Sequence, residues 1–278
     1  MSKIDLASPV LKWVGGKRQL LERLMPLFPE TYTSYCEPFI GGGAVLFALQ
    51  PKNAIINDIN SELIGVYRAI KDDIESLIKR LAQFENTKEC FYEVRGWDRN
   101  AELYNQLTDI DKAARVIFLN KTCYNGLYRV NSAGEFNTPF GRYKNPNIVN
   151  ESTLRAVHEY FNTADITILN TSYSEAVQGL PENSFVYLDP PYDPISVTAS
   201  FTGYNAGGFS REDQIALRDC CRQLDTAGIK FMLSNSATEF IQDIYSEFNI
   251  TIVPAKRAIN SVGSKRGCVD EVVVRNYE

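Results

Sequence analysis

Short apolar runs alternate with amphipathic stretches along most of this 278-residue chain, and the alternation limits the folds open to it. The apolar runs are rich in β-branched and aromatic residues, and they predict strands at 35–39, 54–57, 166–170, 185–188, 230–233, 250–253 and 272–274. Helical spacing of apolar residues predicts helices at 18–27, 44–49, 61–81, 211–224 and 238–248. Ser210, followed by Asp213, supports the start of the fourth helix as its N-cap. We therefore expect an α/β fold with a mostly parallel, seven-stranded sheet and crossover helices.

The alternation lapses between about residues 71 and 150. Helical spacing at 110–121 gives way there to sequence rich in Asn, Gly, Tyr and Pro. This break predicts an insertion of residues 71–150 into a domain whose two parts are 1–70 and 151–278.

Positive charge gathers in the predicted insert. The whole chain has a formal net charge of −5, but residues 112–150 hold six cations and one anion, Glu135, a net charge of +5. The cations are Lys112, Arg115, Lys121, Arg129, Arg142 and Lys144. A basic segment in an acidic body is typical of a protein that meets a polyanion through one face, although a chance fluctuation of surface charge gives the same pattern.

Several classes of protein are excluded. No segment approaches the roughly 18 to 20 apolar residues of a membrane span, and the amino terminus lacks the apolar run of a secretory signal, so we expect a cytoplasmic protein. The six cysteines form no CxxC pair and are expected to be buried, reduced thiols. One histidine, His158, rules out any metal site that needs two, and Ser-His-Asp catalysis unless His158 itself serves. We expect His158 to be a solvated or capping residue.

A glycine-rich turn at 37–44 follows one predicted strand and opens a helix. Gly41 and Gly43 would let a ligand approach the backbone near a helix amino terminus, although an ordinary strand-to-helix turn has the same sequence. Asp58 ends the next strand and could accept hydrogen bonds from ribose hydroxyls. The dinucleotide fingerprint G-x-G-x-x-G is not met, because Leu46 stands where the third glycine belongs.

A second motif, Asp189-Pro190-Pro191-Tyr192, directly follows the strand at 185–188. The prolines have no N–H and a restricted φ, so we expect the carbonyls around them to stay free to accept hydrogen bonds. The Asp189 carboxylate and the Pro190 carbonyl could then each accept one N–H of a planar amine, while Tyr192 stacks on its ring. The amine nitrogen would be aimed at an electrophile without help from a histidine or a metal. The alternative is a strand terminator with a core tyrosine.

These motifs occur in a fixed order with others at 12–17, 58–60, 124–129, 134–137 and 139–143. From about residue 11 to the end, the chain resembles the Dam-type, α-group family of DNA adenine-N6 methyltransferases. The resemblance implies a Rossmann-like class I methyltransferase fold with an inserted helical and hairpin DNA-recognition domain. The segment at 259–261 and Arg266 follow the family only loosely.

The resemblance also implies a cofactor and a catalytic motif. The cofactor is S-adenosyl-L-methionine, and the matching positions are Trp13, Lys17, Phe39, Gly41, Gly43, Asp58 and Asp189. The catalytic residues are Asp189, Pro190, Pro191 and Tyr192. The reaction implied is methylation of the N6 amino group of adenine in double-stranded DNA, by base flipping and direct methyl transfer.

A further set of positions matches the residues that contact DNA in that family. Lys12 and Arg129 would donate to guanine O6 and N7, and Leu127 and Pro139 would meet thymine methyl groups. The full set is Lys12, Tyr124, Asn125, Leu127, Arg129, Pro139 and Arg142, of which Tyr124 and Asn125 would enter the duplex beside the displaced base. By the same resemblance the target is GATC. A monomer would suffice, with no metal and no membrane partner.

Two other functions remain open. The chain could methylate another planar amine, such as a protein glutamine or an RNA base, or it could be a DNA-binding regulator that has lost the reaction. The basic insert and Asp189 favour DNA over other amines, and the intact motifs favour an enzyme. The sequence leaves open a partner restriction endonuclease, the oligomeric state and activity on single-stranded DNA. We also expect the polar loop at 194–209 to become ordered when the target adenine is flipped out.

Overall fold

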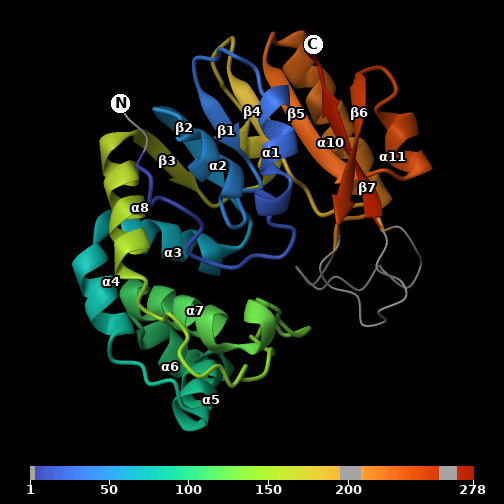
Figure 1. The fold of residues 1–278 in the computed structure, drawn as a ribbon. Helices are drawn as coiled ribbons and strands as arrows, with labels where there is room; N and C mark the ends of the chain where they lie inside the picture. The colour runs from blue at the N-terminus through green and yellow to red at the C-terminus, as the bar shows by residue number, and fades with distance from the viewer. Residues whose placement is uncertain (1–3, 195–207, 257–267) are drawn as a thin grey trace.

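The computed structural model describes residues 4–194, 208–256 and 268–278 (Figure 1). These residues build a seven-stranded sheet with the order β3-β2-β1-β4-β5-β7-β6. The strands are β1 Tyr35–Glu37, β2 Asn53–Asn57, β3 Asp165–Leu169, β4 Phe185–Leu188, β5 Lys230–Ser236, β6 Asn249–Lys256 and β7 Cys268–Arg275. The first five are parallel, whereas β7 lies antiparallel between β5 and β6. The predicted α/β class, with its mostly parallel sheet of seven strands, is confirmed.

Alternate residues of the central strands face two different apolar layers. Tyr35 and Tyr187 belong to the core on the side of the helices that follow β1 and β2. Their neighbours Cys36 and Val186 belong to the core beneath the helix that follows β4. A strand packed on both faces has to be apolar throughout, which is why the run at 185–188 was easy to predict.

The helices flank the sheet and fill the long connection between β2 and β3. They are α1 Leu21–Leu24, α2 Ala44–Leu49, α3 Ser61–Asp72, α4 Ile74–Leu81, α5 Lys88–Gly96, α6 Ala101–Gln106, α7 Asp109–Thr122, α8 Glu151–Thr163, α9 Tyr173–Ala176, α10 Arg211–Thr226 and α11 Glu239–Ile244. The N-cap predicted at Ser210 is confirmed: its side chain accepts a hydrogen bond from the backbone of Asp213 in a reciprocal capping box.

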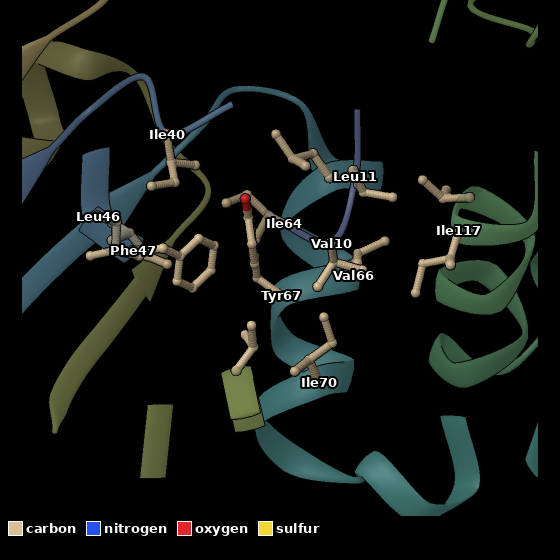
Figure 2. Packing of buried hydrophobic residues seen from close by; sticks show 14 of the residues in the cluster. Val10, Leu11, Ile40, Leu46, Phe47, Ile64, Val66, Tyr67, Ile70 and Ile117 are labelled. Atoms are coloured by element: carbon tan, nitrogen blue, oxygen red, sulfur yellow. The ribbon is translucent and has the colours of Figure 1, made fainter. Parts of the chain in front are cut away.

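Helices α4 to α7 gather at one end of the molecule, below the sheet in Figure 1. Helix α3 lies between them and the rest of the fold. In Figure 2, Tyr67 of α3 faces Phe47 of α2, and Val66 lies on the side of Ile117 of α7. These residues belong to one continuous apolar cluster, so the helical region is packed onto the sheet domain through α3.

Several predicted elements differ from the structure; among them, the helix expected at 238–248 ends at Ile244. The helix expected at 61–81 is broken at Asp73, whose side chain accepts a hydrogen bond from Ser76 N and caps a new helix. The helix expected at 18–27 consists of α1 flanked by the 3₁₀ turns Lys17–Gln19 and Met25–Leu27, the second containing Pro26. The strand expected at 35–39 ends at Glu37, because Pro38 cannot donate to the ladder.

The structure also shows the surroundings of the single histidine and of five cysteines. His158 is half-buried, and its Nδ1 lies 2.7 Å from the carbonyl oxygen of Ile70 in the last turn of α3, the position of a capping residue. Free thiols are present at Cys36, Cys90, Cys123, Cys220 and Cys221. Within the described ranges, no helix is both long and apolar enough to cross a membrane. Most of the loop at 194–209, as well as 259–261 and Arg266, lies outside the described residues.

Candidate active site

The glycine turn connects the carboxyl end of β1 to α2. Gly43 is in the left-handed region, with φ +71°, and it caps α2. Gly41 also has a positive φ, and a Cβ there would lie 3.0 Å from Cδ1 of Trp13. Trp13 can therefore lie on the turn only because the turn lacks side chains. Its ring also stacks on Tyr128, with ring centroids 4.9 Å apart.

Asp58, at the carboxyl end of β2, anchors the same turn. Its Oδ2 accepts a hydrogen bond from Gly41 N at 3.1 Å, and its Oδ1 accepts one from Asn60 N at 3.0 Å. Burial raises the pKa of this carboxyl, while the backbone N–H donors oppose the rise. A carboxylate held beside a glycine turn keeps lone pairs available for a ligand hydroxyl, as the sequence led us to expect.

An ion pair links the amino-terminal segment to the end of β4. Lys17 Nζ lies 2.6 Å from Asp189 Oδ1, and the lysine side chain is only 5% exposed. The same ammonium donates to the carbonyl of Gly15 at 2.9 Å and lies 4.6 Å from the centroid of the Tyr192 ring. The structure therefore brings three predicted site residues, Lys17, Asp189 and Tyr192, into one cluster.

Two carboxyl groups set the electrostatics of this cluster. Burial raises the pKa of Asp189, and Lys17 opposes the rise. The Tyr192 hydroxyl donates to Glu271 Oε2 at 2.8 Å, so a residue of β7 fixes the tyrosine ring. Burial and the neighbouring carboxylates raise the pKa of Tyr192 well above its ordinary value, which keeps the hydroxyl protonated as a donor. Sequence reasoning missed Glu271, because nothing near it in the chain marks its partner.

A buried polar network holds the backbone after Asp189. Gln214 Nε2 donates to the carbonyl of Pro191 at 2.8 Å, and Asn235 Nδ2 donates to Gln214 Oε1 at 3.0 Å. Asn235 Oδ1 in turn accepts from Asp193 N at 3.0 Å. We expected the carbonyls around the prolines to be free; that of Pro191 is engaged by Gln214. These three polar residues were also missed, because their capacity to pair depends on the packing of α10 against β5.

Phe39, another predicted site residue, belongs to an aromatic cluster beyond the end of β1. Its ring stacks on Tyr173, with centroids 5.4 Å apart, and meets Phe209 edge-on at 6.2 Å. Tyr173 and Phe209 carried no motif signal of their own. Their arrangement gives the site a flat apolar wall on the side of the glycine turn.

The predicted DNA-contacting residues come mostly from one folded-back segment after α7. Antiparallel bridges join Cys123 to Phe140 and Val130 to Phe136, so residues 123–140 form an irregular hairpin. Tyr124 is 58% exposed and Asn125 has a positive φ of 58°. Both therefore project from a tight turn rather than from the core.

The remaining predicted DNA contacts are partly or fully exposed. Arg129, Pro139, Arg142 and Lys12 are exposed, and Leu127 is half-buried. Arg129 is oriented by a hydrogen bond from its Nε to Asn137 Oδ1 at 2.7 Å. Lys12, although far away in sequence, lies against Gly126 of the hairpin, where a Cβ would meet its side chain at 2.9 Å.

One cation of the basic segment, Arg115, is buried and cannot contact a polyanion. Arg115 is 2% exposed and pairs with Asp98 and Glu62. Asp98 also accepts a hydrogen bond from Phe136 N at 2.7 Å, so this charge cluster ties α7 to the hairpin. The interpretation of the whole run as a polyanion-facing surface is wrong at Arg115, because this arginine is buried and two partly buried anions on neighbouring elements neutralise it.

Comparisons with known proteins match this architecture. A family model described as D12 class N6 adenine-specific DNA methyltransferase matches residues 13–259. The Type II methyltransferase M1.LlaDCHI of Lactococcus lactis subsp. cremoris is 46% identical, over 99% of this chain and 97% of its own length. The Type II methyltransferase M.MjaIII of Methanocaldococcus jannaschii is 42% identical, over 97% and 99%. The DNA adenine methylase of Escherichia coli K12 is 34% identical, over 95% and 93%. This chain belongs to the D12 class of N6 adenine-specific DNA methyltransferases, and its substrate is the adenine amino group of DNA.

Proposed function

We propose that this enzyme transfers a methyl group from S-adenosyl-L-methionine to adenine N6 within GATC in double-stranded DNA, by base flipping and direct transfer. The observation that carries the proposal is the cluster of Lys17, Asp189 and Tyr192, placed where the carboxyl ends of β1 and β4 meet. Ligands of open α/β sheets bind at such carboxyl ends.

The residues around the glycine turn fit this cofactor. Because Gly41 and Gly43 have no side chains, Trp13 and Phe47 pack directly against the turn, and Trp13 lies where it would cover a cofactor bound beside the turn. Asp58 offers an acceptor for ribose hydroxyls, and Phe39 offers a flat surface for a purine. Asp189 and Lys17 supply opposite charges suited to the ammonium and carboxylate of an amino acid. When bound, the cofactor supplies an electrophilic methyl group.

The chain's own groups then prepare the amine. The Asp189 carboxylate accepts one N–H of the target adenine, and the Pro190 carbonyl accepts the other. Tyr192, fixed by Glu271, stacks on the base. Held in this way, the nitrogen lone pair is turned out of conjugation with the ring and toward the methyl group. The N–C bond would form as the S–C bond of the sulfonium breaks, and the Asp189 carboxylate would take the N6 proton that leaves. The network of Gln214 and Asn235 supports this role, because it removes freedom from the Pro191 backbone.

Recognition of GATC is assigned to the hairpin and to Lys12. Two exposed cations, Lys12 and Arg129, suit the two guanines, and the apolar surfaces of Leu127 and Pro139 suit thymine methyl groups. Exposed Tyr124 suits the stack that the flipped base leaves. Arg142 would contribute a phosphate contact. We propose residues 71–150 as the recognition insert and a monomer as the working unit.

Restriction digestion tests both the reaction and the target. Plasmid DNA from a methylation-deficient host that expresses this chain is digested with two endonucleases that cut GATC, one blocked by adenine methylation and one indifferent to it. Protection from the first enzyme alone supports the proposal. Cleavage by both, together with N6-methyladenine in the same DNA, refutes GATC while leaving the reaction standing.

A further inference from the structure

Asn120, on α7, is 2% exposed and makes three hydrogen bonds to the backbones of two segments, one of them distant in the sequence. Its Oδ1 accepts from Lys12 N at 2.9 Å. Its Nδ2 donates to the carbonyl of Lys12 at 2.9 Å and to the carbonyl of Gly126 at 3.1 Å. Both amide hydrogens and an acceptor lone pair are therefore in use.

The two segments that Asn120 joins belong to different parts of the site. Lys12 directly precedes Trp13, which lies on the glycine turn. Gly126 stands within the hairpin turn formed by Tyr124–Gly126. Asn120 therefore joins the hairpin, which is assigned to DNA, to a segment that carries both Lys12, assigned to DNA, and the neighbouring Trp13, assigned to the cofactor.

Two further contacts bring these segments together. The Trp13 and Tyr128 rings stack at an interplanar angle of 26°. A Cβ on Gly126 would lie 2.9 Å from Cδ of Lys12, so the Lys12 side chain lies against the Gly126 backbone as closely as a residue without a side chain permits. Displacement of the hairpin would thus be transmitted to Lys12 and Trp13 together.

We propose that Asn120 is a positioning residue that couples cofactor binding to recognition of the target base pair. It fixes the position of Lys12 relative to the hairpin. A cofactor bound against Trp13 then holds the DNA-contacting residues of both segments in place. By linkage, target DNA then strengthens cofactor binding by the same factor. This inference rests on the proposed function.

The three hydrogen bonds of Asn120 require an amide, which both donates and accepts. Aspartate at this position would keep the acceptor for Lys12 N but would turn a carboxylate toward two carbonyl oxygens, and alanine would lose all three bonds. Asn162, which is exposed, provides a control for the loss of an amide that bonds two backbone carbonyls. Its Nδ2 donates to the carbonyls of Lys71 and His158, both at 2.9 Å, and these joined segments are neither the amino-terminal segment nor the hairpin.

The experiment measures affinity for S-adenosyl-L-homocysteine, the cofactor without its transferable methyl group, by calorimetry with and without a GATC duplex, for wild type, Asn120→Asp, Asn120→Ala and Asn162→Ala. We expect the duplex to strengthen wild-type cofactor binding about fivefold or more, and this factor to fall close to one in both Asn120 variants. Cofactor affinity without DNA should change less than about threefold. Preference in kcat/KM for GATC over duplexes with one altered G·C pair should fall about tenfold, corresponding to ~1.4 kcal/mol. Asn162→Ala should retain both properties.

A second variant keeps the test decisive if the Asn120 variants unfold. Gly126→Ala would strain the same junction from the hairpin side, because its φ is +63° and its Cβ would meet Lys12. We expect it to lose coupling as well. A folded Asn120 or Gly126 variant that retains wild-type coupling and preference overturns the inference, as does a wild type without coupling. A wild type that methylates no DNA at all overturns the proposed function instead.

Discussion

Lys17 Nζ and Asp189 Oδ1 lie 2.6 Å apart, in an ion pair whose lysine is almost completely buried. The two residues are far apart in the sequence: Lys17 begins the first 3₁₀ turn, and Asp189 follows β4. Asp189 is assigned to the target amine and Lys17 to the cofactor, so the charge on each residue acts directly on the other. The charge state of Asp189 therefore depends on Lys17.

The rate of methyl transfer should fall at low pH, with a midpoint above the ordinary pKa of an aspartate. Burial raises the Asp189 pKa, and the carboxylate form is needed to accept an N–H, so the rate falls as pH drops through that raised value. Lys17→Met removes the opposing cation and should move the midpoint to still higher pH. Single-turnover rates at saturating cofactor between pH 4 and 8 test this, with Lys144→Met as the control. A midpoint that stays in place contradicts the coupling.

Glu271 should act through Tyr192. Glu271→Ala removes the acceptor of the tyrosine hydroxyl, so we expect kcat to fall roughly tenfold, about 1.4 kcal/mol. Glu271→Gln retains an acceptor oxygen and should recover most of the rate. Steady-state kinetics on a GATC duplex measure both variants. Equal losses in the two would show that the hydrogen bond to Tyr192 is not what matters.

Arg129 should read a base and not the phosphate backbone. Arg129→Ala is expected to cost on the order of 1 to 3 kcal/mol of discrimination at one base pair. Lys144→Ala, which removes an exposed cation of the same basic segment, should leave the preference unchanged and at most weaken all sequences alike. Methylation rates on GATC and on each single-base variant separate the two. A uniform loss for Arg129→Ala would place it on phosphate.

Arg115 should matter for stability. Arg115→Ala removes a buried cation from the partly buried Asp98 and Glu62 carboxylates, of which Asp98 keeps its ion pair with Arg99, and we expect a loss of ~1.5 to 3 kcal/mol in the free energy of unfolding. Urea denaturation followed by circular dichroism measures it, with Lys144→Ala as the exposed counterpart. If the urea midpoints of the two variants coincide, the buried pairing carries no net stability.

The sequence pattern predicted the bounds of helices and strands correctly where neighbouring residues alone determine them. The strand at Phe185–Leu188 and the helix at Ala44–Leu49 coincide with their predicted bounds, because the first is apolar throughout and the second begins at a glycine turn. The break at Asp73 was missed because apolar spacing continues across it, and only the bond between Asp73 and Ser76 reveals the new cap.

Site prediction reached the residues that lie in motifs but not those that position them. Lys17, Asp189 and Tyr192 were all named from sequence, yet their direct contact depends on how the segment before β1 packs against the end of β4. Arg115 could not be told from an exposed cation, because its anions lie on other helices. Asn120 carried no signal either, since an asparagine clamp is defined only by the backbones it joins.

Radiolabel transfer tests the central claim most directly. Tritiated S-adenosyl-L-methionine at saturating concentration is incubated with a GATC duplex and either wild type or Asp189→Ala, with a duplex already methylated at both adenines as the blank. We predict label in the wild-type reaction, recovered as N6-methyladenine, no label in the blank, and a rate at least about 10²-fold lower for Asp189→Ala. Near wild-type turnover by Asp189→Ala, or no transfer by wild type to any duplex, would contradict the account.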